Sequence, residues 1–120
     1  METKAKNPVV HFEVLGRDAG ALQRFYSQAF GWSLGQTAGP MEYTMVHVQG
    51  GGGIDGGIGK APQGPGHVTF YVGVTDLDAT LEQVQRLGGT TVQPPTQIPD
   101  GVTFALFADP EGHVVGLLKE

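Results

Sequence analysis

Two predicted strands of this 120-residue chain carry polar side chains that could do acid–base or ligand-binding chemistry. Residues 9–15 and 67–74 alternate between apolar and other side chains, which is typical of half-buried strands. An imidazole can bind a metal or exchange a proton near neutral pH, and a carboxylate buried beside it can act as a general base. The candidate ligand-binding residues on these strands are His11, Glu13, His67, Thr69 and Tyr71.

Four of the five candidates also have a purely structural interpretation. A strand histidine such as His11 is often a hydrogen-bonded core residue, and His67 stands at the start of its strand, next to solvent. Glu13 could be a solvated surface carboxylate, and Tyr71 a core side chain. The two serines lie outside any Gly-x-Ser-x-Gly turn, so the sequence indicates no nucleophile and catalytic residues stay unassigned.

An internal repeat positions the two strands. Asp18 and Asp76 each precede a segment with apolar residues at helical spacing, and Gly31 and Gly89 follow those segments. Both pairs are 58 residues apart, as are Phe12 and Phe70. The expected apolar helix faces are Leu22, Phe25, Tyr26, Ala29 and Phe30, and Leu77, Leu81, Val84 and Leu87. Further strands are predicted near residues 32–36, 42–48, 53–59, 90–93, 102–108 and 113–118.

The order β-α-β-β-β, present twice, predicts an α+β fold in one domain at residues 8–119. Unit one spans 8–60, unit two spans 66–119, and residues 1–7 form a polar N-terminal tail. One such unit cannot bury the free face of its own sheet, so two must pack together. We therefore expect a curved, barrel-like mixed sheet with a helix on the outside of each unit.

Glycine is abundant: the chain has 20 glycine residues, and nine of them lie between positions 50 and 66. In a strand at 53–59, the missing side chains would leave space on the concave side, and Gly116 would do the same in the second unit. The alternative is that these glycines permit close strand packing, with Met45 and Phe104 filling the face. The glycines of the predicted strand are Gly53, Gly56, Gly57 and Gly59.

The ordered motifs resemble the vicinal oxygen chelate superfamily, which includes glyoxalases, bleomycin-resistance proteins and extradiol dioxygenases. The resemblance covers residues 8–119. It rests on His11 seven residues before Asp18, on Gly31-Trp32 after the helix, and on the closing turn 109–112 before His113. We expect His113 to adopt an unusual backbone angle after that turn.

Metal enzymes of the resembled superfamily take ligands from the first and last strands of each unit. His11 fills the first position, but the second-unit positions hold Thr69 and Gly116. Threonine is a poor substitute for imidazole, and glycine offers no side-chain ligand. The resemblance thus implies either no metal or one divalent ion held by His11 in a non-standard set. The candidate partners in that set are His67, Glu13 and Asp55.

Two function classes remain open. The first is a glyoxalase- or bleomycin-resistance-like protein that binds a small organic molecule in the sheet cavity. The second is a lyase, isomerase or dioxygenase that depends on a divalent metal. The missing ligand positions favour the first class.

The resemblance also implies a homodimer, because members of the superfamily are commonly dimeric. The exposed edges of such sheets favour pairing between chains as well.

Charge and composition limit the classes of binding partner and the expected location of the protein. Seven basic residues are scattered among twelve acidic ones, which argues against nucleic acid and anionic membranes as partners. No apolar run approaches the roughly 20 residues of a membrane span, and the polar N-terminus lacks a secretory signal, so we expect a cytoplasmic protein. The absence of cysteine excludes disulfides and thiolate metal sites.

Overall fold

The computed structural model describes residues 6–48, 52–99 and 101–120. Most of the predicted polar tail (residues 1–5) and Gly50 and Gly51 of the glycine-rich run lie outside the described residues. The chain divides into two compact units. The first unit is His11–Thr69, and the second unit combines the residues up to Val10 with Phe70–Glu120.

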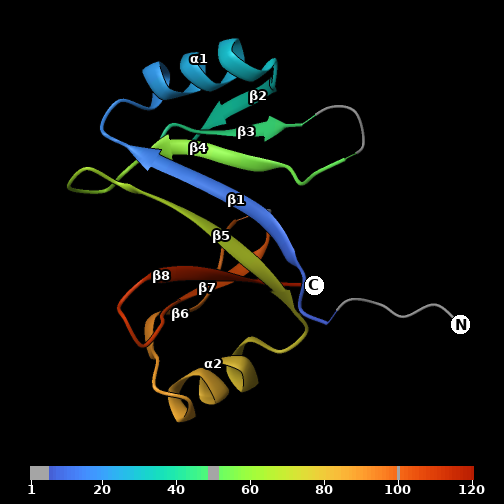
Figure 1. The fold of residues 1–120 in the computed structure, drawn as a ribbon, viewed down its shortest axis with the longest axis vertical. Helices are drawn as coiled ribbons and strands as arrows, with labels where there is room; N and C mark the ends of the chain where they lie inside the picture. Colours follow the sequence, from blue (N-terminus) through green and yellow to red (C-terminus); the bar gives the residue numbers. More distant parts are fainter. Residues whose placement is uncertain (1–5, 49–51, 100) are drawn as a thin grey trace, which may run out of the picture. The chain divides into compact units, whose positions relative to one another are not determined.

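The elements follow the predicted order β-α-β-β-β twice, which confirms the α+β fold and the internal repeat (Figure 1). Their bounds in the first half of the chain are β1 (Val9–Gly16), α1 (Ala19–Phe30), β2 (Ser33–Ala38), β3 (Tyr43–His47) and β4 (Gly56–Lys60). Those in the second half are β5 (His67–Val74), α2 (Leu77–Arg86), β6 (Thr90–Gln97), β7 (Thr103–Ala108) and β8 (Val114–Lys119).

In the first unit the strands are ordered β2-β3-β4-β1, with antiparallel β2/β3 and β3/β4 ladders and a parallel β1/β4 ladder. Helix α1 lies against one face of these strands (Figure 1). Val14, Val46 and Ile58 form the buried core under the helix, with Leu22 and Tyr26 of α1 packed against it. That core fixes which face of the sheet is averted from the helix.

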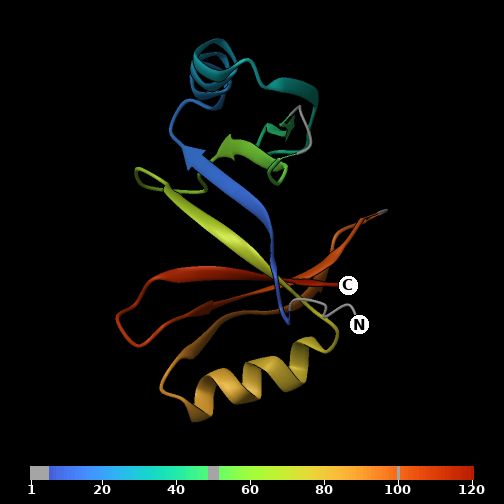
Figure 2. The same cartoon turned by 45° about the vertical axis from the view of Figure 1, so that its right-hand side comes forward.

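The second unit repeats this arrangement with the order β5-β8-β7-β6, in which β5 and β8 are parallel and the other ladders antiparallel. Helix α2 runs alongside its strands (Figure 2). Leu77 and Leu81 of α2 are buried with Ala105 and Leu117 of the sheet.

The helix boundaries follow the predicted capping residues. Asp18 Oδ1 accepts a hydrogen bond from the Ala21 amide at 3.0 Å, and Asp76 does the same for Ala79. Gly31 ends α1 with a left-handed φ of 71°, a conformation that glycine adopts without a Cβ penalty. These caps explain why the 58-residue spacing marks both helices.

Three details differ from expectation. Phe25 and Phe30 are 60% and 61% exposed, and Gln23 is buried instead, because its amide reaches backbone carbonyl groups at Glu42 and Ile58. Leu87 is exposed rather than part of the apolar face of α2. The positive φ of the closing turn falls on Gly112 and not on His113.

Candidate functional site

The face of the first sheet averted from α1 carries the polar side chains. Alternation along β1 places His11 and Glu13 opposite Phe12 and Val14, which belong to the helix-covered core. On β3 the same alternation places Tyr43 opposite Val46 and its core neighbours. The predicted pairing of His11 with Glu13 on one face is therefore consistent with the buried core.

The glycines of β4 let an aromatic ring lie directly on the sheet. A Cβ at Gly57 would overlap the Tyr43 ring, and one at Gly59 would come within 2.8 Å of the same ring. In the second unit a Cβ at Gly116 would overlap the ring of Tyr71. The expectation that these glycines leave open space is therefore wrong, because tyrosine rings occupy that space.

The strand itself is also shorter than predicted. It begins at Gly56, so Gly53 precedes it, and a Cβ at Gly56 would come within 2.5 Å of the Phe12 ring on the helix-covered side. Met45 and Phe104, the predicted alternative fillers, are not the groups that cover Gly57 and Gly116. Glycine in these strands thus serves close approach of Phe12, Tyr43 and Tyr71.

Tyr43 joins three of the predicted site residues into one hydrogen-bonded chain. Its hydroxyl lies 2.9 Å from His11 Nε2 and donates to Glu13 Oε1 at 3.1 Å. The other carboxylate oxygen of Glu13 lies 3.3 Å from His67 Nε2. His11, Tyr43, Glu13 and His67 all belong to the first unit.

The donors and acceptors of this chain follow from counting protons. An ionised carboxylate only accepts, so Glu13 receives one bond from Tyr43 and one from His67 Nε2–H. The single hydroxyl proton of Tyr43 is then used, so its oxygen accepts from His11 Nε2–H. The network thus assigns both imidazoles to the tautomer that carries its proton on Nε2.

Burial and charge act in opposite directions on His11. Its half-buried position lowers its pKa below the usual value, because burial disfavours the imidazolium form. The negative charges of Glu13 and Asp55 raise that pKa in part. His11 is therefore neutral at physiological pH, which suits a hydrogen-bonding role.

Thr69 and Tyr71 are both buried on β5. Thr69 ends the first unit, whereas Tyr71 belongs to the second, where it is paired with Gly116 in the β5/β8 ladder. The predicted convergence of all five candidates on one site stays a prediction. Tyr43 is not among the residues that the sequence singles out for the site; the signal that could have found it is its position on a predicted strand, on the face opposite Val46.

Two other histidines form exposed pairs with carboxylates. His47 Nδ1 lies 3.2 Å from Asp55 Oδ2, and the Val48 amide donates to Asp55 Oδ1. That backbone bond and then the His47 contact lower the pKa of Asp55. His113 pairs in the same way with Asp109, whose carboxylate also accepts from the His113 amide at 2.9 Å. The latter pair therefore braces the turn before β8.

The residues present do not fit the metal-ligand set that the fold family uses. Gly116 has no side-chain donor atom, and the Tyr71 ring covers it. His11 Nε2 is hydrogen-bonded to Tyr43. Thr69 stands where the resemblance to the superfamily implies an imidazole. Among the described residues, no group of three or more histidine and acidic side chains is placed to hold an ion.

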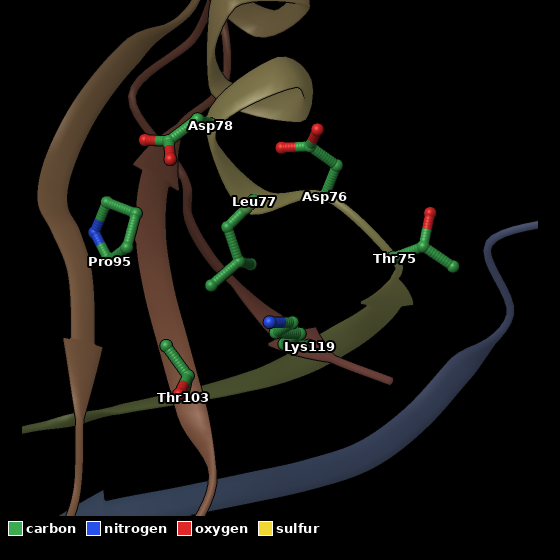
Figure 3. A pocket seen from close by; sticks show the side chains of 7 residues that line it. All are labelled: Thr75, Asp76, Leu77, Asp78, Pro95, Thr103 and Lys119. Atoms are coloured by element: carbon green, nitrogen blue, oxygen red, sulfur yellow. The ribbon is translucent and has the colours of Figure 1, made fainter.

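A hollow of about 380 Å³ lies at the start of α2 in the second unit (Figure 3). Asp76, Asp78 and Lys119 contribute its charged groups. Asp76 is already used as the helix cap, and the hollow contains none of the predicted site residues. It therefore gives no support to the predicted ligand site.

Comparison with known proteins identifies the family. A sequence model of the glyoxalase-like domain matches residues 10–118. The chain therefore belongs to the glyoxalase-like domain family, within the vicinal oxygen chelate superfamily. CFP32 of Mycobacterium bovis and its Mycobacterium tuberculosis counterpart are each 30% identical, over 83% of this chain and 41% of the relative. The chain thus spans about two-fifths of the length of these relatives.

Solved structures share the fold. Methylmalonyl-CoA epimerase from Mycobacterium tuberculosis matches with a TM-score of 0.73 at 16% identity, over 98% of this chain and 92% of that chain. A glyoxalase/bleomycin resistance protein/dioxygenase superfamily member from Vibrio splendidus matches with a TM-score of 0.68 at 16% identity, over 96% and 100%. Neither helix of the described residues has the length and apolarity that a membrane crossing requires.

Proposed function

We propose that the face of the first unit averted from α1 binds a small organic molecule, partly aromatic or otherwise apolar, without the superfamily's full metal site. The observation that carries this proposal is the chain from His11 through Tyr43 and Glu13 to His67. It combines a buried carboxylate with two imidazoles that are only partly covered. Such a chain can orient polar groups of a ligand while Tyr43 and the 40% exposed Met45 offer apolar surface.

The proposed contacts have separate roles. His11 and His67 hydrogen-bond to polar groups of the ligand, and Glu13 orients His67 or pairs with a cationic group. Thr69 is a further candidate anchor on β5. A methylmalonyl-CoA epimerase of the same fold has been solved with methylmalonyl-CoA bound, which supports an organic ligand for this fold.

The test is a fragment screen followed by substitution. Binding of small aromatic fragments is followed by NMR, and the dissociation constant of each hit is compared between the wild type and His11→Ala. Loss of one hydrogen bond between neutral groups corresponds to roughly a tenfold increase in the dissociation constant. His113→Ala is the matched control, since His113 lies on the exposed turn. Hits whose dissociation constants are the same for the wild type and His11→Ala would contradict the proposal.

The metal-dependent lyase, isomerase or dioxygenase is the competing function. Protein purified without an affinity tag or chelator should contain no stoichiometric divalent metal. Zinc, nickel, manganese or iron present at one ion per chain, and lost on His11→Ala, would favour the enzyme instead.

We also propose a homodimer, for which sedimentation should give twice the single-chain mass of 12.6 kDa.

A further inference from the structure

The outer strand of the first unit, β2, has a neighbour on one side only. It ends the order β2-β3-β4-β1 and is paired with β3 alone among the described strands. All six residues of Ser33–Ala38 are exposed. An outer strand presents unpaired backbone N–H and C=O groups, which proteins usually protect with proline or charged residues. Strand β2 contains neither, so its outer edge is open to pairing with another strand.

The internal repeat shows how the same edge is blocked in the second unit. The offset of 58 residues places Gln36 and Thr37 of β2 at the positions of Pro94 and Pro95 in β6, which is the outer strand of the second unit. Proline has no N–H group and cannot donate to a ladder. The register is irregular in both outer ladders, so the two prolines are what distinguishes the edges. The fold thus accommodates proline at these positions, and the first unit has none there.

An apolar surface adjoins the open edge. Helix α1 lies beside β2 and ends in Phe30, whose ring centroid is 5.3 Å from that of Trp32, the residue before β2 (Figure 1). Phe30 is 61% exposed, and Leu34 of β2 is 40% exposed. The repeat places Gly88 where the first unit has Phe30, so the fold itself does not require a ring at this point.

Symmetry, charge and area favour a second copy of this chain as the partner. Two copies of β2 related by a two-fold axis run antiparallel, as an antiparallel ladder requires. No charged residue lies between Arg24 and Glu42, so two copies of this surface bring no like charges together. The exposed residues of β2 with Phe25 and Phe30 offer roughly 600 Å², near the ~800 Å² per partner of a standard interface.

We infer that β2 pairs antiparallel with β2 of a second copy of this chain, and that the same contact covers Phe30 and Leu34. Because prolines block β6, pairing through outer strands stops at two copies and does not continue into a fibre. The inference rests on the proposed homodimer and names the surface through which that dimer forms.

The test places charges on β2. Sedimentation equilibrium measures the dimer dissociation constant of the wild type, of Leu34→Lys/Gln36→Lys and of Leu34→Glu/Gln36→Glu. We expect the dissociation constant of each variant alone to rise about tenfold or more, because like charges meet across the two-fold axis. An equimolar mixture, with one variant labelled with nitrogen-15, should form a dimer that contains one copy of each in native mass spectrometry. Gln97→Lys on β6 is the matched control and should leave the dissociation constant unchanged.

Hydrogen exchange locates the contact independently. Backbone amides of β2 should exchange more slowly at a protein concentration where the dimer forms than after dilution, whereas those of β6 should not change. Gln36→Pro should remove that protection and leave far-UV circular dichroism unchanged, because the second unit carries Pro94 at the same position of the repeat. A dimer that persists in both charge variants and in Gln36→Pro would overturn the inference and leave the homodimer proposal standing. A wild type that stays monomeric at millimolar concentration would overturn both.

Discussion

The side chain of Tyr43 crosses β4 at Gly57 to reach Glu13. Gly57 is paired with Met45 of β3 on one side and with Glu13 of β1 on the other. Because Gly57 has no side chain, the ring lies on the backbone and its hydroxyl comes within 3.1 Å of the carboxylate. One glycine thus makes room for a contact between side chains on non-adjacent strands.

Gly57→Ala should therefore disturb both stability and the polar chain. The new methyl group would overlap the Tyr43 ring, and overpacking of this kind costs about 1–3 kcal/mol of unfolding free energy. Urea unfolding measures the loss. Gly52→Ala is the control, because a Cβ at Gly52 meets no atom within 4 Å. Equal stability of the two variants would show that the ring moves aside freely.

Tyr43→Phe should keep the ring on Gly57 but remove the hydroxyl that links His11 and Glu13. We expect a loss of about 1–3 kcal/mol, because a partly buried donor and acceptor lose a common partner. A double-mutant cycle with Glu13→Gln should give a coupling free energy of about 0.5 kcal/mol or more. Strictly additive effects of the two substitutions would contradict a hydrogen bond between the side chains.

Gln23→Ala should be among the more destabilising polar substitutions in α1. The buried amide donates to the Ile58 carbonyl at 2.8 Å and to the Glu42 carbonyl at 3.0 Å. Its removal leaves two acceptors without this donor, at a cost of about 1–3 kcal/mol. Gln28→Ala on the exposed side of the same helix should change stability by less than about 0.5 kcal/mol. Thermal unfolding of the pair checks the difference.

The stability contributed at His11 should fall as the solution becomes acidic. Burial, partly offset by Glu13 and Asp55, lowers its pKa below the ordinary value of 6.5. Between the folded pKa and 6.5 the unfolded chain binds more protons at His11, so the free energy of unfolding decreases as pH falls through that window. The difference in unfolding free energy between wild type and His11→Gln, measured by urea titration, should shrink in the same direction. A difference that grows towards acid pH would contradict this sign.

The repeat and its helix caps could be predicted because they depend on local rules. Asp18 and Asp76 cap helices through their own side chains, and Gly31 takes the left-handed angle that its position requires. Strand alternation likewise placed His11 and Glu13 on the face averted from the helix. These features need no knowledge of which strands are neighbours.

The site itself depends on strand register, which the sequence pattern does not supply. The alignment of Gly57 between Met45 and Glu13 decides that Tyr43 fills the space beside the glycine. The prediction of which residues of α1 are buried was wrong for a related reason. Apolar spacing favoured Phe25, but the carbonyl groups that Gln23 reaches lie on other segments of the chain.

The division of the chain into units has a consequence for protein synthesis. The Pro8 carbonyl accepts a hydrogen bond from the Gly73 amide at 2.8 Å, and both belong to the second unit. Pro8 leaves the ribosome long before Gly73 is made, so the residue that leads into β1 must wait for its partner from the later half of the chain. A gene cut in the connector at residues 61–66 would therefore give a C-terminal fragment that lacks Pro8. A circular permutant that opens the same connector and links Glu120 to the N-terminus would keep Pro8 and residues 70–120 on one continuous stretch of chain.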